Sequence, residues 1–341
     1  MKVITFGEIL LRLSAPGYNK LFQKDFLDTS FCGAEANVAV ALSNYEVNAS
    51  FVTKLPNNDV AKASINTLKY FGVDVSKIVY GNGRVGLYYL EKGASQRPSK
   101  IIYDRAYSAI ALAKKEDFNW NSIFEGVDWF HWSGINPALS DDLKDISLEA
   151  CKVAKEKGLT VSCDLNFRSS LWTQEEAKKT MTKILPYVDV CIGNEEDADK
   201  MLGIRAAGTD VDKGIINSES YISVARQINK NFGCKFVATT LRESISASRN
   251  KWSGLLYDSE EDKCYHSKIY DIQIVDRVGG GDSFSSGLIY GLIMNKSKQE
   301  TVEFATAASC LKQTMEGDFN RSTVADVEKL VHGSGSGRVQ R

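Results

Sequence analysis

Strand-like and helix-like segments alternate along most of this chain of 341 residues, and the alternation restricts the possible folds more than any other feature of the sequence. The apolar runs MKVITFGE (1–8) and ASFVTKLP (49–56) are each followed by a segment whose apolar residues have helical spacing. The same order resumes at residue 127. Parallel strands are joined by crossover helices, so the sequence predicts an α/β fold with a mostly parallel central sheet and helices on both faces.

A different pattern occupies residues 83–105, where GRVGLYYLEKG and KIIYDR are extended segments with no helix between them. Strands joined by a short connection pair in an antiparallel manner. We therefore expect a small separate β-sheet that acts as a lid, formed by residues 11–32 and 83–105. The α/β core is then assigned to residues 1–10, 33–82 and 106–332, and residues 333–341 to a flexible tail.

Composition and charge exclude several kinds of partner. The 42 basic and 43 acidic residues give a net charge of −1, and no dense cluster of Lys and Arg suits a nucleic acid or an anionic membrane. The sequence has no secretory signal and no apolar run long enough to span a membrane, and its seven cysteines include no C-x-x-C pair. We therefore expect a cytoplasmic protein with reduced thiols and a small-molecule ligand.

Three glycines and an aspartate, namely Gly279, Gly280, Gly281 and Asp282, stand directly before a helix-like segment. Glycine has no side chain, so these three backbone amides can converge on an anion at the positive end of the helix. Beside such an anion hole, Asp282 would accept a proton from an attacking hydroxyl during phosphoryl transfer. The alternative is that Asp282 caps the helix and the glycines make a tight turn.

The stretch DRVGGGDSF (276–284) resembles the C-terminal signature D-T-x-G-A-G-D-x-F of the ribokinase-like (PfkB) carbohydrate kinases, with Arg277 and Gly280 in place of Thr and Ala. Far upstream, CGAEAN (32–37) is similar to the substrate motif G-G-x-x-x-N of that family, with Cys32 in place of the first Gly. The resemblance implies a ribokinase-like three-layer αβα sandwich. It also implies an ATP-dependent kinase in which Asp282 is the general base.

Within this family, residues 86–109, 164–172 and 317–320 resemble segments of kinases that act on 2-keto-3-deoxygluconate. The implied reaction phosphorylates the C6 hydroxyl of 2-keto-3-deoxy-D-gluconate to give 2-keto-3-deoxy-6-phosphogluconate. The residues implied in substrate binding are Gly33, Ala34, Asn37, Tyr88, Tyr103, Arg105, Arg168, Asp282 and Asp318. Arg105 and Arg168 would select an acid sugar, because a guanidinium matches a carboxylate that neutral sugars lack. The alternatives are ordinary ion pairs for the arginines and packing in the small sheet for the tyrosines.

The nucleotide loop T-L-G-x-x-G of the family corresponds to TLRESI (240–245), which has Arg242 and Ile245 at the glycine positions, and GNEED (193–197) is similar to its magnesium element N-x-x-E. The residues implied in ATP binding are Asn166, Arg168, Asn194, Thr240, Leu241, Arg242, Ile245, Gly279 and Gly281. Glu195 and Asp197 are implied in binding Mg²⁺ through water. A monovalent cation is a further candidate cofactor. The alternatives are a purely structural loop and acidic residues that cap a helix.

Several other functions remain open at the level of the sequence. A neutral-sugar kinase such as a fructokinase or ribokinase would share the fold and the base, and keto-deoxygalactonate is a further candidate substrate. A non-catalytic sugar-binding or regulatory protein would explain the altered nucleotide loop. A dinucleotide-dependent oxidoreductase would need the G-x-G-x-x-G fingerprint, which the chain lacks. We also expect a homo-oligomer formed through the lid sheet.

Overall fold

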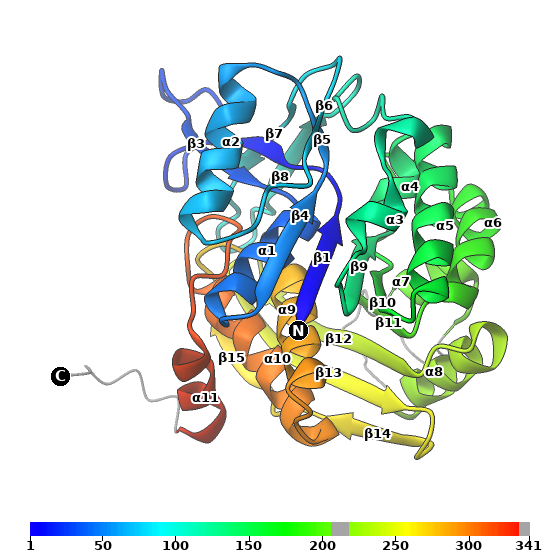
Figure 1. The fold of residues 1–341 in the computed structure, drawn as a ribbon. Helices are drawn as coiled ribbons and strands as arrows, with labels where there is room; N and C mark the ends of the chain where they lie inside the picture. The colour runs from blue at the N-terminus through cyan, green and yellow to red at the C-terminus, as the bar shows by residue number, and fades with distance from the viewer. Residues whose placement is uncertain (195, 206–217, 334–341) are drawn as a thin grey trace.

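The large sheet is the centre of the molecule in the computed structural model, which describes residues 1–194, 196–205 and 218–333 (Figure 1). Within these residues, nine strands form this sheet in the order β14-β13-β12-β11-β10-β9-β1-β4, with β15 also paired to β13. The six strands from β12 to β4 of that order run parallel, and β13, β14 and β15 pair in an antiparallel manner. The strands are β1 (Lys2–Phe6), β4 (Asn48–Val52), β9 (Trp129–Ser133), β10 (Thr160–Asp164), β11 (Val190–Asn194), β12 (Phe236–Ser246), β13 (Arg249–Asp258), β14 (Lys263–His266) and β15 (Tyr270–Gln273).

Helices cover both faces of this sheet. They are α1 (Ala34–Asn44), α2 (Asp59–Tyr70), α3 (Trp120–Ile123), α4 (Ile135–Leu139), α5 (Asp141–Glu156), α6 (Gln174–Ile184), α7 (Asp197–Leu202), α8 (Ser218–Phe232), α9 (Gly280–Ile293), α10 (Lys298–Gln313) and α11 (Val324–His332). In the described ranges, each helix is too short or too polar to cross a membrane.

Two separate hydrophobic cores show that the architecture has three layers. One core joins the sheet to α5, α6 and α8, which contribute Leu143, Met181 and Ile228 among others. The second core joins the opposite face to α1, α9 and α10, and Figure 1 shows these helices across the sheet from α5 and α6. The predicted αβα sandwich is therefore confirmed.

Close packing between α9 and α10 fixes the direction of α9. A Cβ atom at Gly287 would lie only 2.7 Å from the Cα atom of Ala305 in α10, so the two backbones approach more closely than a side chain would allow. Almost all of α9 is buried. Its amino terminus, which carries the glycine run, is consequently held in place by the core.

A second sheet of four strands has the order β3-β2-β7-β8. Its strands are β3 (Asp28–Cys32), β2 (Leu10–Ser14), β7 (Gly86–Glu91) and β8 (Lys100–Asp104). The prediction of a small separate sheet is therefore confirmed, although β2 and β7 pair in parallel and only the two outer pairs are antiparallel. A further pair of short strands, β5 (Lys54–Leu55) and β6 (Val79–Tyr80), lies apart from both sheets.

The prediction of a nucleotide loop at residues 240–245 is wrong in its local structure. Strand β12 runs from Phe236 to Ser246 and pairs with β13 as a long hairpin, with one register shift between Ser244 and Ser246. The physical reason is that the glycines that would break a strand are replaced by Arg242 and Ile245. Arg242 stays in the ladder opposite Trp252, and the register shifts only at Ile245, between Ser244 and Ser246.

Candidate active site

One cavity of about 470 Å³ gathers nearly all of the predicted site residues. It lies at the carboxyl ends of β10 and β11, between the amino termini of α1 and α9 and beside the small sheet, as is usual for ligand sites in parallel α/β sheets. The predicted residues that line it are Gly33, Ala34, Asn37, Tyr88, Tyr103, Arg105, Asn166, Arg168, Asn194, Asp197, Thr240, Arg242, Gly279, Gly280, Gly281, Asp282 and Asp318.

Two predicted site residues that the structure describes, Leu241 and Ile245, are not among those that line the cavity. Leu241 is buried in the hydrophobic core, because alternation along β12 turns it away from the face that carries Thr240 and Arg242. Ile245 is 48% exposed on the hairpin. The geometry of their side chains gives no support to the predicted contacts of these two residues with ATP, which stay a prediction. Glu195, predicted to bind Mg²⁺, lies outside the described residues.

The glycine turn presents backbone amides to the cavity. Gly279 has φ +81°, and a Cβ atom there would lie 2.2 Å from the carbonyl oxygen of Asp318, so only glycine fits. The amide of Gly280 donates to the carbonyl of Arg277 at 3.3 Å, within the turn itself. In the described part of the chain, no backbone carbonyl accepts from the amides of Gly281 and Asp282. The amide of Gly279 likewise has no backbone acceptor among the described residues, so the free donors at this turn are the amides of Gly279, Gly281 and Asp282.

Asp282 lies in the first turn of α9 and faces the cavity. Its Oδ2 atom accepts a hydrogen bond of 2.6 Å from the side-chain amide of Asn37 in α1. Burial raises the pKa of Asp282 to about 6, and the charge of Asp318 adds to this increase. Asp282 therefore has the position and the proton affinity of a general base near neutral pH.

The two predicted carboxylate-binding arginines differ in their surroundings. Arg105 is buried and forms an ion pair with Glu8, whose Oε2 atom lies 2.7 Å from both Nε and Nη2. Arg168 donates to the carbonyl oxygen of Phe167 at 3.0 Å, and it has no ion-pair partner among the residues that the structure describes. Arg168 is thus the freer cation in the cavity, and the ordinary ion pair weighed for Arg105 is present.

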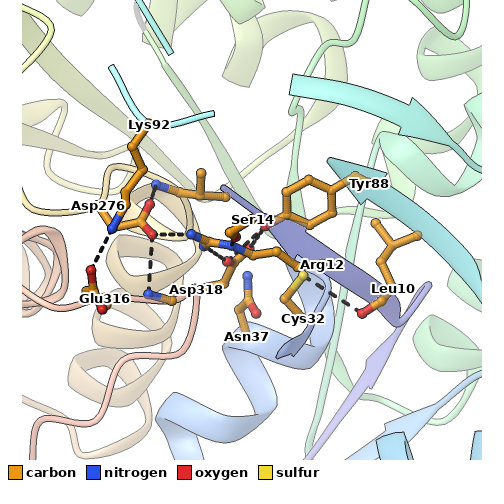
Figure 2. Close-up of polar contacts among 12 residues, drawn as sticks. Leu10, Arg12, Ser14, Cys32, Asn37, Tyr88, Lys92, Asp276, Glu316 and Asp318 are labelled. Atoms are coloured by element: carbon orange, nitrogen blue, oxygen red, sulfur yellow. Dashed lines mark hydrogen bonds and ion pairs between the residues drawn. The ribbon is translucent and has the colours of Figure 1, made fainter. Parts of the chain in front are cut away.

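Arg12, a residue that no sequence motif predicts, is the centre of a buried network (Figure 2). Its guanidinium forms ion pairs with Asp276 and Asp318, and its Nε atom donates to the hydroxyl of Ser14 at 2.6 Å. The hydroxyl of Tyr88 lies 2.8 Å from Oδ2 of Asp318. Arg12 therefore ties strand β2 of the small sheet to the glycine turn and to the predicted substrate residues. The only signal for Arg12 in the sequence is its position in an alternating strand, where it shares the buried face with Leu10 and Ser14.

Buried carboxyl groups form the other polar part of the site. Asp197 accepts hydrogen bonds from the backbone amides of Phe167 and Asn194, at 3.0 and 2.9 Å, and so holds two loops together. Burial and the charges of Asp197 and Asp282 raise the pKa of Asp164 well above its usual range. Glu35, a further residue that the sequence did not reveal, accepts a 2.5 Å hydrogen bond from Ser133, and burial raises its pKa to about 7.

This donor set fits a magnesium ion that keeps most of its waters. In the described ranges no group of three or more His, Cys, Asp or Glu side chains is arranged to hold a metal directly. Asp164, Asp197 and Asp282 nevertheless all face the cavity, and their negative charges repel one another. A cation placed between these carboxylates on one side and a bound phosphate on the other would relieve this repulsion.

Comparisons with known proteins agree with this arrangement. Residues 1–323 match the model of the pfkB family of carbohydrate kinases. The chain belongs to this family. As a pfkB carbohydrate kinase it transfers a phosphoryl group to a sugar hydroxyl, so the oxidoreductase and the non-catalytic alternatives are wrong.

Similar pfkB proteins include kinases of sugar acids and of neutral sugars. The crystal structure of a 2-dehydro-3-deoxygluconokinase from Thermotoga maritima is 51% identical, with a TM-score of 0.94 over 98% of this chain and 100% of that one. A 2-dehydro-3-deoxygalactonokinase from Haloferax volcanii is 30% identical over 98% of each chain. A fructokinase from Xylella fastidiosa, solved with bound ATP, is 21% identical, with a TM-score of 0.74 over 97% of this chain and 98% of that one.

Proposed function

We propose that this kinase transfers the γ-phosphoryl group of ATP to the C6 hydroxyl of 2-keto-3-deoxy-D-gluconate, which is also called 2-dehydro-3-deoxygluconate. One observation carries the proposal: the base Asp282, the open amides of Gly281 and Asp282, and the cation Arg168 all belong to one cavity. The similarity to the Thermotoga maritima enzyme supports the same substrate.

The acid end of the sugar is assigned to the cavity wall that carries Arg105 and Arg168. Arg168 supplies a guanidinium for the carboxylate, and Arg105 adds the donors that Glu8 leaves free. Tyr103 stacks near Arg105, with the guanidinium 5.3 Å from the ring centroid. Tyr88 and Asp318, already bonded to each other, shape the floor of the sugar site. Gly33, Ala34 and Asn37 contact the sugar hydroxyls from the start of α1.

The chemical step uses residues at the start of α9. Asp282 accepts the proton of the C6 hydroxyl, O6 forms a bond to the γ-phosphorus, and the bond from that phosphorus to the oxygen of ADP breaks. The amides of Gly281 and Asp282 stabilise the charge on the transferring group. Asp164 and Asp197 would hold Mg²⁺ through waters, and the bound ion would neutralise part of the phosphate charge. Movement of the small sheet over the site would exclude water.

Keto-deoxygalactonate is a second candidate substrate, because a relative at 30% identity is named for it. The two acids differ in configuration at C4, whereas fructose and ribose lack the carboxylate. A coupled assay of ATP consumption with all four compounds tests the proposal. We expect the highest kcat/KM with 2-keto-3-deoxygluconate. Equal or faster turnover of fructose would reject the acid-sugar assignment and leave a neutral-sugar kinase.

The assembly of the protein belongs to the same proposal. Ile101 lines the cavity, so alternation along strand β8 turns Ile102, which is 42% exposed, to the opposite face of the small sheet. An exposed apolar residue on this outer face would be covered by the same sheet of a second copy. Analytical ultracentrifugation should give a dimer, and Ile102→Lys should give a monomer.

We also assign the enzyme to the cytoplasm, since all seven cysteines are thiols. Activity assays with K⁺ and with Na⁺ test whether a monovalent cation is needed.

A further inference from the structure

The wall of the cavity formed by the β12–β13 hairpin carries hydrogen-bond donors. Antiparallel register pairs Arg242 with Trp252, so both side chains leave the hairpin on the same face, and both line the cavity. The indole Nε1 atom of Trp252 is buried and has no hydrogen-bond partner among the described residues. A buried donor without an acceptor is costly unless a ligand supplies one.

Arg277 joins this wall from the turn that precedes α9. Its Nη2 atom donates to the carbonyl oxygen of Ala247 at 3.0 Å, but its Nε atom is buried without a partner in the part of the chain that the structure describes. Burial and the nearby charge of Arg242 lower the pKa of Arg277, although Asp276 opposes this effect. Two guanidinium groups therefore face one cavity and repel each other beside the glycine turn.

An anion with several charges that lay between these two groups would relieve their mutual repulsion. The amides of Gly281 and Asp282 can serve one phosphoryl group, the one next to the base. A nucleotide triphosphate has two further phosphates. A guanidinium is suited to them because it can donate two parallel hydrogen bonds to phosphate oxygens.

We propose that Arg242 and Arg277 bind the α- and β-phosphates of the nucleotide and stabilise the negative charge that appears on ADP when the bond to the γ-phosphorus breaks. This inference rests on the proposed function for the identity of the donor, and it does not depend on which sugar accepts the phosphoryl group. It assigns Arg277, at a position outside the β12–β13 hairpin, a direct role in recognising the polyphosphate chain.

Calorimetric titration of the full-length protein with ADP and with adenosine tests this assignment without turnover. Arg277→Met should raise the dissociation constant of ADP by about 10- to 100-fold, as expected for loss of charged hydrogen bonds. The dissociation constant of adenosine should stay unchanged, and Arg277→Lys should recover part of the ADP affinity. Arg249→Met is the matched control, because Arg249 lies on β13 but is ion-paired with Asp271 and is not among the residues lining the cavity.

Steady-state kinetics separate this inference from the proposed function. The KM for ATP should rise in Arg277→Met while the KM for the accepted sugar stays within about twofold. Equal weakening of ADP and adenosine would mean that Arg277 shapes the pocket rather than binds phosphate, and unchanged ADP affinity would also overturn the inference. If only the assay of candidate sugars gives the contrary result, the proposed acceptor sugar is rejected and the assignment of the two arginines still holds.

Discussion

The side-chain amide of Asn37 donates a hydrogen bond of 2.6 Å to Oδ2 of Asp282, although the two residues are 245 positions apart in the chain. Asn37 lies in α1 and Asp282 in the first turn of α9, and these two helices pack against each other. Because Asn37 occupies Oδ2, the orientation of the carboxylate is fixed and its Oδ1 atom is left for the hydroxyl of a substrate. The proposed base is thus positioned before any ligand arrives.

Replacement of Asp282 by Asn keeps the size of the side chain and removes the proton acceptor. We expect kcat to fall by about 10²- to 10⁴-fold, with a small change in the KM for the sugar acid. The coupled ATP-consumption assay measures this loss. A variant that kept a tenth of the wild-type kcat would show that another group accepts the proton.

The same variant should be more stable than the wild type at neutral pH. The pKa of Asp282 is raised from 3.8 to about 6, so the folded state binds its proton more tightly than the unfolded state does. The resulting stabilisation is complete below pH 3.8 and is lost as the pH rises through about 6. Ionised Asp282 therefore costs on the order of 1 to 3 kcal/mol at pH 7.5. Calorimetric melting of Asp282→Asn should show a higher Tm at pH 7.5, and a gain that shrinks toward pH 4.5.

The pH dependence of kcat/KM should fall below about pH 6, because protonated Asp282 cannot accept a proton. Glu35, with a pKa of about 7, is a second group that titrates close to the site. The pH profile of Glu35→Gln distinguishes the two residues. We expect the acid limb to persist in this variant, and its disappearance would assign the limb to Glu35.

Removal of the two arginines should have different consequences. Arg168→Met should raise the KM for the sugar acid by about 10- to 100-fold without changing the KM for fructose, because Arg168 is the cation without an ion-pair partner in the described residues. Arg105→Met should in addition destabilise the protein by about 3 to 5 kcal/mol, since it leaves Glu8 buried and unpaired. Urea denaturation and substrate kinetics measure both effects, and equal behaviour of the two variants would contradict this distinction.

Alanine substitutions at Gly279 and at Gly281 give a matched pair of variants. Gly279→Ala should destabilise the protein and abolish activity, because the residue has φ +81° and its Cβ atom would meet the carbonyl of Asp318. Gly281→Ala should keep the wild-type Tm, since no atom lies within 4 Å of its added Cβ. Its methyl group would still obstruct a phosphate at the free amides, so we expect a higher KM for ATP. Normal kinetics in this variant would place the phosphate elsewhere.

Local constraints explain which parts of the site the sequence could predict. Gly279 and Asp282 were found because a left-handed turn before a helix needs glycine and leaves a recognisable pattern. Arg12 was missed because its partners lie 264 and 306 positions away, and no spacing rule connects them. The family pattern predicts a loop at residues 240–245, whereas these residues lie in strand β12, in keeping with their own strand preference.

The network around Arg12 has a consequence for synthesis of the chain. Arg12 is translated long before Asp276 and Asp318, which neutralise it and lie 264 and 306 positions further along the chain. A nascent polypeptide released before residue 276 would keep this guanidinium without its counter-ions and would also lack the catalytic turn. Products of translation interrupted before Asp318 are therefore expected to be inert toward ATP.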